Sequence, residues 1–83
     1  MNVEISIPEF DGNAIDVIWE EAAHIELGYE DNQILIRADC KGLLSLAKQM
    51  IYMAVNDIGS GSHVHYDGYF LGDTPFELVV EKL

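Results

Sequence analysis

The sequence predicts an α+β fold, a two-layer sandwich in which one amphipathic helix packs on a mainly antiparallel sheet of four to five strands, in the order β-β-β-α-β-β. Two observations lead to this prediction. Short runs in which apolar and polar residues alternate lie on both sides of a single stretch with helical periodicity. The chain has only 83 residues, which predicts one domain, residues 1–83. One amphipathic helix is a minimal cover for the apolar face of so small a sheet.

The first part of the chain contains two predicted strands. Residues 2–7 alternate polar and apolar side chains, as a half-buried strand does, and Pro8 ends the run. Residues 14–21 are ambiguous, because Ile15, Val17 and Trp19 alternate as in a strand while the following Glu-Glu-Ala-Ala would suit a helix. We expect a strand here.

Residues 25–39 predict a hairpin. A two-residue turn at Asp31 and Asn32, which tolerate positive φ, makes the numbers of facing residues sum to 63. This register places Glu26 opposite Arg37, an exposed pair of opposite charge worth roughly 0.2 to 1 kcal/mol. It also brings the apolar residues together on the other face, as the pairs Tyr29 with Ile34, Leu27 with Ile36 and Ile25 with Ala38.

A helix is predicted from about residue 40 to residue 57. Asp39 precedes it and is suited to cap its first turn, and Gly42 would allow close packing on the sheet. The predicted inward face follows apolar residues at steps of three and four, namely Leu44, Ala47, Ile51, Ala54, Val55 and Ile58. After the glycine- and serine-rich stop at 59–62, we expect a strand at 62–67, a loop at 68–75 and a last strand at 76–83.

The composition restricts the class of partner. The formal net charge is -11 and the pI about 4.2, although 49% of the residues are hydrophobic. Residues 1–39 carry ten acids and one base, and residues 40–83 carry five acids and three bases. Four cations are too few to neutralise a phosphate backbone, so direct binding to nucleic acid or to an anionic membrane is not expected. A basic protein partner fits this charge, although solubility alone could also account for it.

Cysteine content and the N-terminus favour a cytoplasmic protein. The single Cys40 cannot form an internal disulfide. No stretch has the pattern of a signal peptide or the length and apolar character of a membrane-spanning helix.

No cofactor is expected. Gly59-Ser60-Gly61 follows the predicted helix, whereas a phosphate-binding loop would precede a helix.

His63, His65 and Asp67 are the residues most suggestive of a reactive or metal site. On a strand they share one face, and two imidazoles with a carboxylate are a ligand set for non-haem metals. Residues along one flat strand seldom converge on a single ion, so exposed surface or interface histidines are the favoured interpretation. Cys40 beside Lys41 lacks an associated base, so nucleophilic catalysis is not expected.

The predicted loop at 68–75 contains Tyr69, Phe70 and Leu71 in succession between glycines. Three consecutive large apolar side chains can fold under as a small satellite core. They can equally stay exposed as an aromatic anchor for a partner. Both interpretations remain open for this loop, and also for Trp19 and Phe10.

The second half of the chain resembles a known family. Its order of motifs, over residues 34–83, is similar to that of small bacterial immunity proteins of polymorphic toxin systems, the family numbered thirty-two. The motifs are a helix that begins after an Asp and carries Gly42, Leu43, Leu46 and Ala47, then Gly61, Ser62, His63, His65 and Asp67, then Glu77 to Lys82. The resemblance implies a non-catalytic inhibitor that binds a cognate toxin domain.

These considerations lead to one functional hypothesis with two alternatives. We expect a non-enzymatic protein whose acidic surface covers a basic toxin cleft, and which could form a homodimer through an exposed sheet edge. The alternatives are a DNA-mimicking inhibitor of a nucleic-acid enzyme and a small His/Asp metal-binding protein. The expected partner-binding residues are Glu20, Glu21, Glu26, Glu30, Asp31, His63, His65, Asp67, Tyr69 and Phe70.

Overall fold

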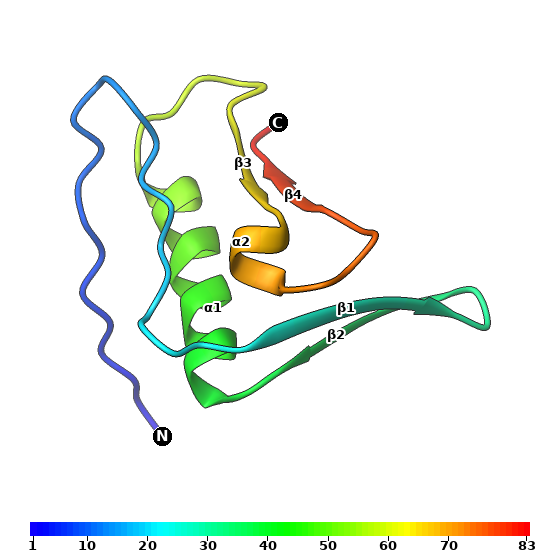
Figure 1. The fold of residues 1–83 in the computed structure, drawn as a ribbon. Coiled ribbons are helices and arrows are strands. Elements are labelled where there is room, and N and C mark those ends of the chain that lie inside the picture. Colours follow the sequence, from blue (N-terminus) through cyan, green and yellow to red (C-terminus); the bar gives the residue numbers. More distant parts are fainter.

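A computed structural model describes all residues, 1–83, and has an α+β fold. One long helix is accompanied by two separate antiparallel sheets of two strands each and by a short helix (Figure 1). The predicted single sheet of four to five strands is therefore wrong, and the two-layer sandwich is not confirmed. The elements are β1 (Ile25–Glu30), β2 (Gln33–Ala38), α1 (Cys40–Val55), β3 (His63–Tyr66), α2 (Gly68–Leu71) and β4 (Leu78–Glu81).

The β1–β2 hairpin has the predicted register. Glu26 faces Arg37 and Tyr29 faces Ile34, as the sum of 63 requires. Asp31 and Asn32 both have positive φ, at 51° and 62°, which is the backbone geometry of a type I′ turn. The register was predictable because the turn and both strands are neighbours in sequence.

Helix α1 begins as predicted. The Asp39 carboxylate accepts hydrogen bonds from the Gly42 N–H at 2.7 Å and from the His24 N–H at 3.1 Å. These two bonds hold the pKa of Asp39 below its ordinary value, and the bond from Gly42 has the larger effect. Gly42 is buried, and a Cβ there would lie 2.5 Å from the carbonyl oxygen of His24. The absence of a side chain thus lets the helix start against the base of the hairpin.

The predicted inward face of α1 is wrong at most of its positions, although Ile58, just beyond the helix, is buried in the core as predicted. Leu44, Ile51 and Val55 are exposed, and 69% of Val55 is accessible to solvent. The buried residues instead form a different stripe that includes polar side chains, namely Gly42, Ser45, Leu46, Gln49, Tyr52 and Met53. The polar members are buried because they bond to a neighbouring stretch of backbone.

That stretch is residues 14–20, most of the segment 14–21 for which a strand was predicted. It is extended but pairs with no strand, and residues 1–19 make no hydrogen bond from backbone to backbone. Alternate N–H groups donate instead to side chains spaced along α1, which we call the ladder. Its rungs are Asp16 N to the Tyr52 hydroxyl at 3.2 Å, Ile18 N to Gln49 Oε1 at 2.7 Å and Glu20 N to Ser45 Oγ at 3.0 Å.

Gln49 is the central residue of the ladder. It is completely buried, its Nε2 donates to the Asp16 carbonyl at 3.1 Å, and its Oε1 also accepts from the Tyr66 hydroxyl at 2.8 Å. That hydroxyl contacts the Ile18 carbonyl as well, at 3.2 Å. Burial raises the pKa of Tyr66 to about 12. The three rungs, the Gln49 Nε2 and the Tyr66 hydroxyl together provide hydrogen-bond partners for an extended segment that has no sheet partner.

The strand predicted at residues 2–7 is also absent. In the view of Figure 1 this segment runs along the outer edge of the molecule, outside residues 14–20. Ile7 packs against the core, and Asn56 at the end of α1 bonds to the Pro8 carbonyl at 3.2 Å and the Phe10 N–H at 2.9 Å. No neighbouring strand offers a sheet edge to it, so alternation alone did not produce a strand.

The last third of the chain forms β3, α2 and β4. Both strands are shorter than predicted, and the predicted loop contains α2, whose first turn is capped by the Asp67 carboxylate at 3.0 Å from the Tyr69 N–H. Phe70 of α2 packs on Trp19 of the extended segment, with ring centroids 5.0 Å apart, and on Tyr66 at 5.4 Å. This aromatic cluster joins the N-terminal segment to the second sheet. No helix is long and apolar enough to cross a membrane.

Candidate partner-binding surface

The acidic side chains cover the surface without local compensation. All fifteen Asp and Glu residues are exposed. Only Glu26 and Glu77 lie within ion-pair distance of a basic side chain or histidine, Glu26 at 3.8 Å from Arg37 and 3.7 Å from His24, and Glu77 in contact with His65. Helix α1 is the exception to the acidic surface, because it contains no acid and two lysines. The uncompensated charge therefore lies on the segments around α1.

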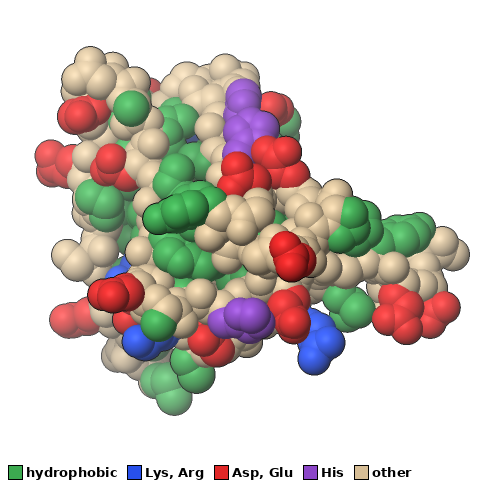
Figure 2. All heavy atoms as spheres, in the orientation of Figure 1, with side chains coloured by type: hydrophobic (Ala, Val, Ile, Leu, Met, Phe, Trp, Pro, Cys, Tyr) green, Lys and Arg blue, Asp and Glu red, His purple; other side chains and the backbone are tan.

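The hairpin extends beyond the body of the protein (Figure 1). Its apolar face is covered only at the base, where Ile25 is 1% exposed. Towards the turn the same face opens to solvent, with 62% of Tyr29 and 79% of Ile34 exposed. Figure 2 shows apolar side chains along the hairpin, with acidic side chains beside them at its far end. We call this uncovered part the hairpin face; it consists of Tyr29, Ile34 and Ile36.

A groove adjoins the hairpin face. It has a volume of about 360 Å³ and lies between the hairpin and the start of β4. Leu27, Gly28, Tyr29 and Ile34 line one side of it, and Phe76, Glu77, Leu78 and Val79 line the other. Six of these eight residues are hydrophobic, and the charged one is an acid. We call it the hairpin groove.

His63 and His65 lie together on the exposed face of β3, as predicted, with ring centroids 4.8 Å apart. Asp67 does not join them, because it follows the strand and caps α2. The carboxylate that contacts His65 is Glu77, which sequence reasoning did not identify. No group of three or more His, Cys, Asp or Glu side chains is placed to hold a metal ion.

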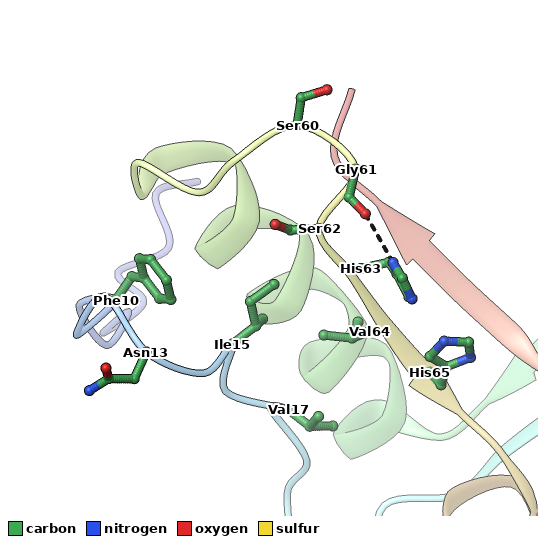
Figure 3. A pocket seen from close by; sticks show the side chains of 10 residues that line it. All are labelled: Phe10, Asn13, Ile15, Val17, Ser60, Gly61, Ser62, His63, Val64 and His65. Carbon is green, nitrogen blue, oxygen red and sulfur yellow. Dashed lines mark hydrogen bonds between the residues drawn. The ribbon is translucent and has the colours of Figure 1, made fainter.

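An open hollow borders this histidine pair. It has a volume of about 770 Å³ and lies between β3 and the segment from Phe10 to Val17 (Figure 3). The His63 ring bonds to the Gly61 carbonyl at 3.0 Å. The side chains drawn in Figure 3 include no acid or base other than the two histidines, so the hollow offers few charged groups for a reaction.

The remaining predicted residues do not form one cluster. Glu26, Glu30 and Asp31 lie on the hairpin, whereas Glu20 and Glu21 lie at the end of the extended segment, where the Glu20 N–H is a rung of the ladder. The two interpretations of the aromatic loop apply to different residues. Tyr69 is 90% exposed, while Phe70 is half-buried in the aromatic cluster.

Sequence reasoning missed the hairpin face and the hairpin groove. A signal was present, since the predicted register already placed Tyr29, Leu27, Ile34 and Ile36 on one face. In the predicted fold, that face would have been buried between the helix and a larger sheet. The structure has two small sheets instead, and no other element buries the face near the turn.

Comparison with known proteins places the chain in a family. The family profile of Immunity protein 32 matches residues 33–83, more than half of the chain. No curated protein and no solved structure matches the chain. The chain therefore belongs to the Immunity protein 32 family.

Proposed function

We propose that this member of the Immunity protein 32 family is a non-catalytic cytoplasmic protein that binds a cognate toxin domain and neutralises it by covering a basic surface. Family membership supports the toxin-neutralising role. We infer that the partner is basic from the fifteen exposed acids, of which only two have an ion-pair partner.

The uncompensated charge acts before contact. A surface field of one sign raises the rate at which an oppositely charged partner is encountered, and the effect weakens with ionic strength. The hairpin is the part best placed for this role, because it projects from the body and carries Glu30 and Asp31, which have no ion-pair partner, beside Glu26, which pairs with Arg37 (Figure 1). The other expected contact residues, Glu20, Glu21, His63, His65, Asp67 and Tyr69, are exposed on neighbouring segments.

Titration calorimetry tests the proposal. The purified chain is mixed at low salt with the toxin domain encoded beside its gene, and we expect the two to form a complex. Formation of this complex should protect cells from the toxin. Absence of heat and of a complex by size exclusion at low salt would contradict the proposal.

A charge reversal tests whether the acids of the hairpin speed the encounter with the toxin. Glu26→Lys combined with Glu30→Lys should slow association about tenfold or more and change dissociation less. The matched control is Glu4→Lys combined with Glu9→Lys, which makes the same change in net charge on the N-terminal segment, on the far side of α1 from the hairpin (Figure 1). Stopped-flow kinetics at two salt concentrations measures both variants. Equal slowing by the two pairs would show that net charge alone matters, and not the hairpin.

A further inference from the structure

The hairpin face is an apolar surface that the rest of the chain does not cover. A soluble monomer can leave single apolar side chains exposed, but here Tyr29, Ile34 and Ile36 are adjacent on one face of a projecting hairpin. The base of the same face, at Ile25, belongs to the core. The burial thus decreases along one continuous face, from complete at the base to minimal at the turn.

The hairpin groove gives this face a second wall. Phe76, Leu78 and Val79 lie opposite Leu27 and Tyr29, so a side chain that enters the groove meets apolar atoms on both sides. β1 pairs only with β2, and β4 only with β3. Each sheet therefore has strand edges without a strand partner, to which an extended segment can form backbone hydrogen bonds.

The charges around the groove select the occupant. Glu77 lines it, Glu30 and Asp31 stand at the turn end, and no Lys or Arg lines it. A second copy of the chain would bring another net charge of -11 against these acids. A segment that carries Lys or Arg next to apolar residues satisfies both the acidic rim and the apolar walls.

We propose that the hairpin groove, together with the hairpin face, is the docking site for an apolar segment of the toxin that is flanked by basic residues. This inference rests on the proposed function and adds to it the place and the chemistry of the contact. The acids speed the encounter, and the Tyr29 and Ile34 side chains, which the toxin segment buries, then set the lifetime of the complex.

Truncation of the hairpin face tests the proposal. Tyr29→Ala combined with Ile34→Ala should raise the Kd for the neighbouring toxin domain about thirtyfold, mainly by faster dissociation, because a buried aromatic anchor commonly contributes 2 kcal/mol or more. The matched control is Leu43→Ala combined with Val55→Ala, two apolar residues of α1 that are also more than half exposed. The control should leave the Kd unchanged. Circular dichroism and urea unfolding establish that both variants remain folded.

The possible outcomes separate the two proposals. If the wild-type chain binds the toxin and the hairpin variant binds equally well, or no worse than the control, the docking site is overturned while the proposed function stands. If the wild-type chain does not bind the toxin, the proposed function fails and the docking site fails with it.

A second copy of this chain is the other candidate occupant of the hairpin groove. Sedimentation velocity of the chain alone, in high salt to screen its charge, should show a monomer. A dimer that the Tyr29→Ala, Ile34→Ala variant dissociates would assign the groove to self-association and overturn the proposal.

Discussion

Two extended regions with similar sequence patterns have different surroundings in this protein. Residues 15–20 and strand β1 of the hairpin both have a large apolar side chain at every second position, and each has two acids among the positions between. The hairpin satisfies its own backbone and projects from the body, whereas residues 14–20 depend on side chains of α1, more than twenty residues away in sequence. Alternation therefore indicates an extended chain but not its partner, and the partner decides whether the segment stabilises the fold or remains available for binding.

The most damaging change to the ladder is Gln49→Leu. It deprives the Ile18 N–H, the Asp16 carbonyl and the Tyr66 hydroxyl of a buried partner at once. Each such loss costs about 1 to 3 kcal/mol, so we expect the free energy of unfolding to fall by at least about 3 kcal/mol. Urea unfolding followed by circular dichroism measures it.

The matched control is Gln33→Leu at the exposed end of β2. It should change the free energy of unfolding by no more than about 0.5 kcal/mol. Equal effects of the two substitutions would contradict the structural role of the ladder.

The contact between α1 and the base of the hairpin is sensitive at Gly42. Gly42→Ala should destabilise the fold by about 1 to 3 kcal/mol, because the new Cβ would press on the His24 carbonyl and on Ile25. In an ordinary helix interior the same change stabilises by up to about 1 kcal/mol. Thermal unfolding distinguishes the two signs.

Gly68 is the control for Gly42. It lies in α2, and a Cβ at that position meets no atom within 4 Å. Gly68→Ala should therefore cause no loss of stability. A stabilising effect of Gly42→Ala would show that α1 does not approach the hairpin as closely as described.

A smaller effect is expected at Tyr66. Tyr66→Phe removes the hydroxyl whose single proton is shared between Gln49 Oε1 and the Ile18 carbonyl, and it should cost about 1 to 2 kcal/mol near neutral pH. The pKa of Tyr66 is raised to about 12 by burial, so the unfolded chain releases its proton at a lower pH than the folded chain. The contribution of Tyr66 to stability is thus complete below pH 10 and is lost as the pH rises towards 12.

Urea unfolding between pH 8 and pH 11 tests this dependence. The difference in stability between the wild-type chain and the Tyr66→Phe variant should narrow as the pH rises above 10. A difference that stays constant over this range would contradict a buried, protonated Tyr66.

The same contrast explains what the sequence could predict. The hairpin register and the cap at Asp39 each depend on residues near one another in the chain, and both are confirmed. The close approach at Gly42 is confirmed as well, although its partners His24 and Ile25 lie at the base of the hairpin. The inward face of α1 was wrong because apolar periodicity gives no weight to a buried Gln49. Its polar atoms are needed only because residues 14–20 have no strand partner, which is a property of the tertiary fold.

For the surface, the exposed histidine pair was predictable from the period of two along β3. The role of Asp67 was not, since it depends on α2 where a loop was expected. The hairpin face was missed for a related reason, because the expected sheet was larger than the two small sheets that form.

Hydrogen exchange of the chain, alone and with the toxin domain, tests the contrast between the two regions most directly. We predict slow exchange at the Asp16, Ile18 and Glu20 amides in both states, because the ladder already bonds them. New protection in the complex should appear in residues 27–36 and 76–79. Fast exchange of the ladder amides in the free chain, or a complex that leaves the hairpin groove unprotected, would contradict the account.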